Sequence, residues 1–173
     1  DAFMKYPVLL PAGDVLAHLE DYDSIIDVRS PSEFRDDHMP GAINLPVLDD
    51  AQRAEIGTIY KQINPFEAKR SGAALVAQNL AGHLQTDLAK KDRDWRPLIY
   101  CWRGGQRSGA MAKILSDIGW HSAVIEGGYK SYRKATLDDL DQLPANSVDL
   151  IFADPPYILS NDGFTVHAGK RVK

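Results

Sequence analysis

The sequence contains a single cysteine, Cys101, among 173 residues. No internal disulfide can therefore form, as is typical of proteins of the reducing cytosol. No apolar run approaches the roughly 20 residues that span a membrane, and the N-terminal residues lack the basic and apolar segments of a secretory signal. We therefore expect a cytoplasmic protein without membrane contact, in which Cys101 is the one candidate thiol nucleophile.

An excess of positive charge is also missing. The net charge is -4 and the sequence pI is about 5.7, so the composition does not indicate a globally basic nucleic-acid-binding protein. A local patch could still contact a tRNA backbone or stack a base, although a solvated helix face has the same composition. The residues of this candidate patch are Tyr60, Lys61, Phe66, Lys69 and Arg70. The five histidines and the cysteine show no metal-site spacing, and we expect neither a metal nor a cofactor.

Short apolar runs alternate with helical patterns along the chain. Strands are expected at residues 6–10, 24–28, 42–45, 97–101 and 123–126, and helices at 11–20 and 106–118. Ser30 and Pro31 are typical of a helix start, and residues 49–88 are mostly helical with a break at Asn64 and Pro65. This alternation predicts an α/β domain with a mostly parallel sheet flanked by helices. Ligand sites in such sheets lie at the carboxyl ends of the strands, where Cys101 is expected.

The loop after Cys101 has the composition of an anion-binding site. Gly104 and Gly105 allow successive N–H groups to turn toward one centre, and the following helix adds its positive end. Arg107 adds a fixed charge, and Ser108 can donate a hydrogen bond to the sulfur. Such surroundings favour the reactive thiolate. The alternative is a buried structural cysteine before a glycine turn.

Three motifs resemble the signatures of rhodanese domains, in the family's order. They are Asp27-Val28-Arg29 with Glu33-Phe34 and His38-Met39-Pro40-Gly41-Ala42-Ile43-Asn44, then the Cys101 loop, then Glu126-Gly127-Gly128-Tyr129. The resemblance implies a three-layer fold and sulfur or selenium transfer through a persulfide-like intermediate on Cys101. It implies an anion-binding loop made of Trp102, Arg103, Gly104, Gly105, Gln106, Arg107 and Ser108, with possible support from Asp27, Arg29, Gly127, Gly128 and Tyr129.

Further motifs resemble one subgroup, the bacterial tRNA 2-selenouridine synthases. They are Leu45-Pro46-Val47-Leu48-Asp49-Asp50, Gly57-Thr58-Ile59-Tyr60-Lys61-Gln62, Pro65-Phe66-Glu67-Ala68-Lys69-Arg70 and Tyr100-Cys101-Trp102-Arg103-Gly104-Gly105. The resemblance implies a sulfur or selenium donor (thiosulfate, a persulfide or selenophosphate) and tRNA as a possible partner. Those synthases also have a P-loop domain, and no G-x-x-x-x-G-K-[ST] motif is present here. The expected role is therefore that of the half of such a synthase that handles sulfur or selenium.

The spacing from Cys101 to Arg107 keeps a second enzyme class open. Five residues separate the two, whereas ordinary rhodaneses have four, and five is the spacing of cysteine-dependent phosphatases, some of which share the rhodanese fold. The third interpretation, beside a transferase and a phosphatase, is a catalytically idle module that binds tRNA or a protein.

Other residues receive mainly structural predictions. Arg29 and Glu33 are expected to form an ion pair, and His38 to hydrogen-bond the backbone. Trp102 and Arg103 are expected to shape the entry to the loop. Tyr129 and Lys130 are expected to border the same mouth.

The chain changes character after residue 134. The motif Asp154-Pro155-Pro156-Tyr157 resembles the catalytic motif of DNA amino-methyltransferases, in which these residues bind a flipped base. The glycine-rich junction for S-adenosylmethionine is missing. We therefore predict a rhodanese domain at residues 1–134 and a short appendage at 135–173 without methyltransferase activity.

Overall fold

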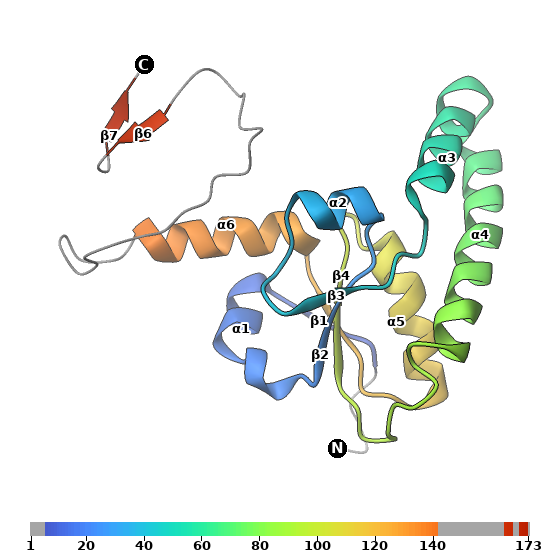
Figure 1. The fold of residues 1–173 in the computed structure, drawn as a ribbon, viewed down its shortest axis with the longest axis horizontal. Coiled ribbons are helices and arrows are strands. Elements are labelled where there is room, and N and C mark those ends of the chain that lie inside the picture. Colours follow the sequence, from blue (N-terminus) through green and yellow to red (C-terminus); the bar gives the residue numbers. More distant parts are fainter. Residues whose placement is uncertain (1–5, 142–164, 168–169, 173) are drawn as a thin grey trace. The chain divides into compact units, whose positions relative to one another are not determined.

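The structure, a computed structural model, describes residues 6–141, 165–167 and 170–172 (Figure 1). The chain forms two compact units, Asp1–Gln142 and Leu143–Lys173. The first unit contains a five-stranded sheet of order β1-β5-β4-β2-β3, in which every neighbouring pair is parallel. Its strands are β1 (Val8–Leu10), β2 (Ser24–Asp27), β3 (Ala42–Asn44), β4 (Pro97–Tyr100) and β5 (Ala123–Ile125). The predicted α/β architecture with a parallel sheet is confirmed.

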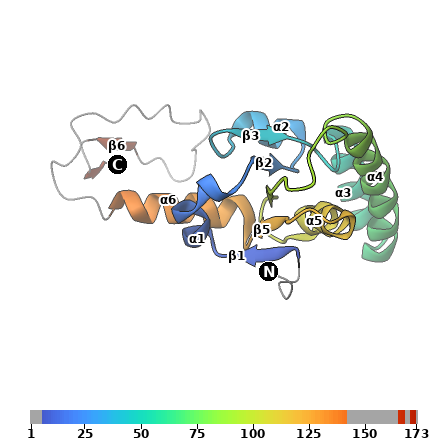
Figure 2. The same cartoon turned by 90° about the horizontal axis from the view of Figure 1, so that it is seen from below.

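Helices cover both faces of this sheet (Figure 2). They are α1 (Ala12–Ala17), α2 (Pro31–Asp36), α3 (Asp50–Gln62), α4 (Pro65–Gln85), α5 (Gln106–Ile118) and α6 (Gly128–Asp141), with a 3-10 turn at Leu19–Asp21. Alternate residues of β4 enter two different cores, because side chains alternate along a strand. Leu98 and Tyr100 pack with α1 and the start of α6, whereas Ile99 and Cys101 pack with α4 and α5. Cys101 is thus placed on the α5 side of the sheet.

Two of the predicted helix starts are confirmed by their local hydrogen bonds. The Ser30 N–H donates to Glu33 Oε2 at 3.1 Å, and Pro31 occupies the first turn of α2. The Asn64 side chain accepts from the Glu67 N–H at 2.8 Å and caps α4. The cap explains why the long helical stretch divides into the α3–α4 hairpin.

Two elements differ from the sequence prediction. The expected helix at residues 11–20 ends as α1 at Ala17 and continues as the 3-10 turn. Helix α6 was not predicted, and it runs past residue 134 to Asp141. Its signal was the spacing of Tyr129, Tyr132 and Ala135, which pack on the core beside α1. The predicted boundary between the rhodanese domain and the C-terminal appendage, at residue 134, remains a prediction.

In the second unit the structure describes an antiparallel strand pair, β6 (Thr165–His167) with β7 (Lys170–Val172). The motif at Asp154 lies outside the described residues, so the predicted methyltransferase fragment has no structural support. Among the helices described, none is long and apolar enough to span a membrane.

Candidate active site at the carboxyl end of strand β4

Cys101 directly follows β4 and lies at the carboxyl edge of the parallel sheet, as expected from the sequence. Its residue surface is 3% exposed, and it packs in the core formed with α4 and α5. All four residues of β4 are buried. A central strand buried on both faces holds the cysteine backbone in a defined position.

Ser108 supplies the polar contact to the cysteine sulfur. Its Oγ donates a hydrogen bond to Cys101 Sγ at 3.3 Å, and the serine is itself buried. Ser108 lies in the first turn of α5, so its hydroxyl is carried by a rigid element rather than by the loop. The predicted contact between these two residues is confirmed.

The loop between β4 and α5 turns at Gly105, which has φ +71° and is the N-terminal cap of α5. Only glycine adopts this left-handed conformation at low cost. Among the described residues, no acceptor is found for the backbone N–H groups from Trp102 to Gln106. These groups, beside the positive end of α5, are available to an anion bound next to Cys101. Trp102, Arg103 and Gly104 are exposed at the loop's outer surface.

The start of α6 holds the same loop from the other side. The Tyr129 N–H donates to the Cys101 carbonyl oxygen at 2.8 Å, and the Lys130 N–H donates to that of Trp102 at 3.1 Å. Gly128 has φ +61°, and a Cβ there would overlap the Cys101 carbonyl oxygen and lie 2.9 Å from Trp102 backbone atoms. The closing glycine motif therefore permits α6 to approach the cysteine loop. Tyr129 is buried and Lys130 is exposed.

A buried ion pair lies beneath Tyr129. Arg29 Nη2 donates to Asp27 Oδ2 at 2.7 Å and to the Asp37 carbonyl oxygen at 2.6 Å. The Arg29 guanidinium carbon is 4.3 Å from the centre of the Tyr129 ring. Burial alone would lower the pKa of Arg29, but the hydrogen bond and charge of Asp27 raise it. Arg29 thus lies against the ring of Tyr129, whose N–H holds the Cys101 carbonyl oxygen, and Asp27 binds the Arg29 guanidinium. A supporting role of Asp27 and Arg29 for the site remains a prediction.

The predicted Arg29–Glu33 ion pair is wrong. Glu33 instead accepts from Arg107 Nη1 at 2.7 Å, with Arg53 Nε at 3.4 Å from the same oxygen. Arg29 points into the core toward Asp27, whereas Glu33 lies in the first turn of α2 and faces α5. Burial would raise the pKa of Glu33, but the hydrogen bond and charge of Arg107 lower it to about 2. Glu33 therefore stays ionised and fixes the Arg107 guanidinium at the start of α5.

A hollow of about 690 Å³ lies beside the cysteine loop, and the sequence did not indicate it. Helices α3, α4 and α5 line it, and Gln106 and Arg107 at the start of α5, next to the cysteine loop, contribute to its wall. The apolar lining comes from Leu48, Ile56, Tyr60, Ala68, Gly72, Ala73, Val76, Ala77, Leu80, Ala110 and Ile114. Small residues on α4 make this space, because bulkier side chains at the same positions would fill the gap between the helices.

The histidines of the described residues do not converge on a metal site. No group of three or more His, Cys, Asp or Glu side chains within residues 6–141, 165–167 and 170–172 could hold an ion. His38 Nδ1 lies 2.8 Å from the Phe34 carbonyl oxygen, and this confirms its predicted backbone hydrogen bond.

Known proteins resemble most of the first unit. Residues 11–135 match the family model described as "Rhodanese-like domain". A tRNA 2-selenouridine synthase from Proteus mirabilis is 38% identical over 82% of this chain, and one from Nitrosomonas europaea is 37% identical over 76%. The matched regions span 40% and 34% of those relatives. The N-terminal domain of a putative ATP/GTP binding protein from Clostridium difficile 630 has a TM-score of 0.62 and 36% identity, over 75% of this chain and 98% of that one.

Proposed function

The chain belongs to the rhodanese-like domain family, and from this premise we propose that Cys101 carries sulfur or selenium as a persulfide-type intermediate. The observation that supports the proposal best is the setting of the sulfur. Cys101 Sγ accepts a hydrogen bond from Ser108 Oγ and lies at the base of a loop whose N–H groups have no acceptor within the described part of the chain. A structural cysteine would need neither feature. The proposed location is the cytoplasm.

The chemistry of loading follows from a thiolate nucleophile. The Cys101 thiolate attacks the outer sulfur of a sulfane-sulfur donor such as thiosulfate. A new S–S bond forms, the donor's S–S bond breaks, and sulfite leaves with the electron pair of that bond. The terminal sulfur of the product, Cys–S–S⁻, carries the negative charge, and the N–H groups from Trp102 to Gln106 stabilise it. A nucleophilic acceptor then takes the terminal atom and releases the Cys101 thiolate.

The relatives support a more specific acceptor and donor. Because this chain is related to tRNA 2-selenouridine synthases, we propose a tRNA nucleotide as the final acceptor of the carried atom. Selenophosphate is an alternative donor: the Cys101 thiolate attacks its selenium, an S–Se bond forms, the P–Se bond breaks, and phosphite leaves with the electron pair of that bond. The chain spans about two-fifths or less of those relatives, so the proposal assigns to it the carrier step alone.

A turnover assay tests the proposal. Wild-type protein with thiosulfate and cyanide should release sulfite and thiocyanate, and Cys101→Ser should not. An aryl phosphate is the substrate for the rival reaction, and we expect no turnover because Glu33 holds the Arg107 guanidinium. Phosphate release that requires Cys101, without sulfur transfer, would replace the carrier by a phosphatase. No turnover of either substrate, with tRNA binding that survives Cys101→Ser, would indicate an idle docking module.

A further inference from the structure

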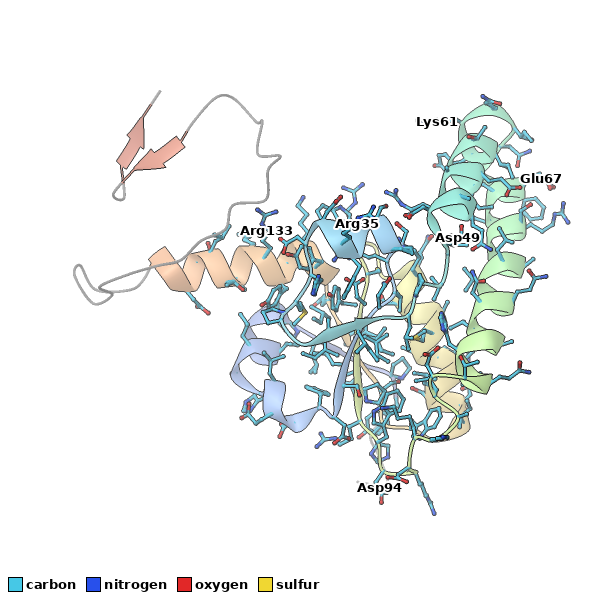
Figure 3. All side chains as sticks on the ribbon, viewed as in Figure 1. Arg35, Asp49, Lys61, Glu67, Asp94 and Arg133 are labelled. Carbon is cyan, nitrogen blue, oxygen red and sulfur yellow. The ribbon has the colours of Figure 1, made fainter. Side chains whose placement is uncertain are left out.

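Large apolar side chains are exposed at the tip of the α3–α4 hairpin. The side chains of Tyr60, Ile63 and Phe66 have exposed fractions of 56%, 66% and 70%. All three lie within seven consecutive residues, so they form one cluster. The two helices run side by side at the edge of the domain, and Lys61 and Glu67 mark the tip (Figures 1 and 3). Isolated exposed apolar residues are common on proteins, but a cluster on a projecting element is typical of a binding surface.

The charge at the tip of this hairpin favours an anionic partner. At the tip, residues 60–70, the sequence contains three basic residues, Lys61, Lys69 and Arg70, and one acidic residue, Glu67, although the whole chain has a net charge of -4. Arg70 Nη2 pairs with Glu67 at 2.7 Å. Lys61 and Lys69 are exposed, and neither has an acidic partner among the described residues. Two uncompensated positive charges therefore flank the exposed aromatic rings.

The tip is also connected to the cysteine loop. Tyr60 and Lys69 line the 690 Å³ hollow, and Gln106 and Arg107 line the same hollow from the start of α5. One continuous recess is therefore shared by the exposed tip and the loop that holds Cys101. A partner bound at the tip would lie next to the site that carries the transferable atom.

We propose that the tip of the α3–α4 hairpin binds single-stranded RNA and presents its nucleotides to the Cys101 loop. Tyr60 and Phe66 stack on bases, and Lys61 and Lys69 contact phosphates. Exposed aromatic rings with adjacent basic groups are the combination that binds single strands with little sequence preference. The inference rests on the proposed function, since tRNA as the acceptor selects RNA among anionic polymers.

Binding of a labelled stem–loop RNA to the full chain tests this surface. We expect Tyr60→Ala with Phe66→Ala to weaken binding at least about tenfold, from the loss of two stacking rings. Lys61→Glu with Lys69→Glu should weaken binding and reduce the salt dependence, with the log–log slope smaller by about 1.4 for two lost phosphate contacts. A duplex of the same stem without the loop should bind weakly to the wild type.

Matched controls lie away from the hairpin. Lys90→Glu with Arg93→Glu makes the same charge change in the exposed loop near Asp94, at the opposite end of the domain from Lys61 (Figure 3). Ile118→Ala removes an exposed apolar side chain from α5. Both controls should bind the stem–loop as the wild type does.

Sulfur loading of Cys101 by thiosulfate, measured on the same variants, separates this inference from the proposed function. Hairpin variants that load sulfur normally but lose RNA binding support the inference. If both hairpin variants bind the RNA as tightly as the wild type does, the inference is overturned. It is also overturned if the wild type loads sulfur but does not bind the RNA. A dimer that the hairpin variants abolish, without RNA binding, would assign the tip to a second copy of the chain. A wild type that does not load sulfur at all would contradict the carrier function, and the RNA-binding measurement would still be valid.

Discussion

The backbone N–H of Tyr129 donates a hydrogen bond to the carbonyl oxygen of Cys101 at 2.8 Å. This contact joins the start of α6 to the residue that carries the proposed chemistry. It requires Gly128, because a side chain there would meet the backbone of Cys101 and Trp102. The position of the cysteine loop therefore depends on a segment that follows it by more than 20 residues.

Gly128→Ala should disrupt this junction. The residue has φ +61°, and its new Cβ would contact backbone atoms that cannot move away without shifting the loop. We expect the free energy of unfolding to fall by about 3 kcal/mol or more, and sulfur loading to fall with it. Urea unfolding measures the first quantity.

Gly82→Ala is the matched control for Gly128→Ala. Gly82 lies within α4, and a Cβ there has no neighbour within 4 Å. This variant should be neutral or more stable by about 0.5–1 kcal/mol. Equal losses in the two variants would contradict the close approach at Gly128.

Ser108→Ala should slow the loading of Cys101 while leaving the fold intact. The variant removes the hydroxyl that donates to the sulfur at 3.3 Å. A hydrogen bond to a charged group contributes about 1.5–3 kcal/mol, so we expect the rate of loading by thiosulfate to fall about tenfold or more. Ser71→Ala, on α4, is the control and should load normally. An unchanged rate for Ser108→Ala would show that the hydroxyl does not act on the thiolate.

Glu33→Gln should reveal the ion pair with Arg107 through its pH dependence. The pKa of Glu33 is lowered from 4.5 to about 2 in the folded protein, so its contribution to stability is complete above about pH 4.5. At pH 7 we expect the variant to be less stable by about 2 kcal/mol. The difference from the wild type should shrink as the pH falls toward 2, because the folded protein then binds the proton as well. Urea unfolding across this pH range measures the difference.

Glu67→Gln controls for the loss of a carboxylate in an ion pair. Its partner Arg70 is 66% exposed, and exposed pairs contribute less than about 1 kcal/mol. If the free energy of unfolding falls no more in Glu33→Gln than in this control, a structural role for the Glu33–Arg107 pair is contradicted.

Asp27→Asn should cost more stability than any exposed pair, since it leaves the buried Arg29 guanidinium without its counter-charge. Breaking a buried ion pair costs about 3–5 kcal/mol. Asp117→Asn, which breaks the exposed pair with Lys113, should change the unfolding free energy by less than about 0.5 kcal/mol. Similar values for both variants would show that the Asp27–Arg29 pair does not support the domain.

The parts of the fold that local patterns determine were predictable. Helix α5 begins at Gln106 and ends at Ile118 as predicted, because a glycine turn and a glycine cap bound it. The contact of Ser108 with Cys101 follows from one turn of that helix. Contacts between distant segments were not predictable: Glu33 meets Arg107 across 74 residues, and the pattern at Arg29 indicated a nearer partner. The hollow between α3, α4 and α5 depends on how three helices pack, which hydrophobic periodicity does not specify.

Intact-protein mass spectrometry after incubation with thiosulfate shows whether Cys101 itself carries the transferred atom. Cys101 is the single cysteine of the chain, so an added sulfur has one expected position. We expect a gain of one sulfur atom on the wild type, its removal by cyanide, and no gain on Cys101→Ser. No gain on the wild type, or an equal gain on both proteins, would show that Cys101 is not the carrier.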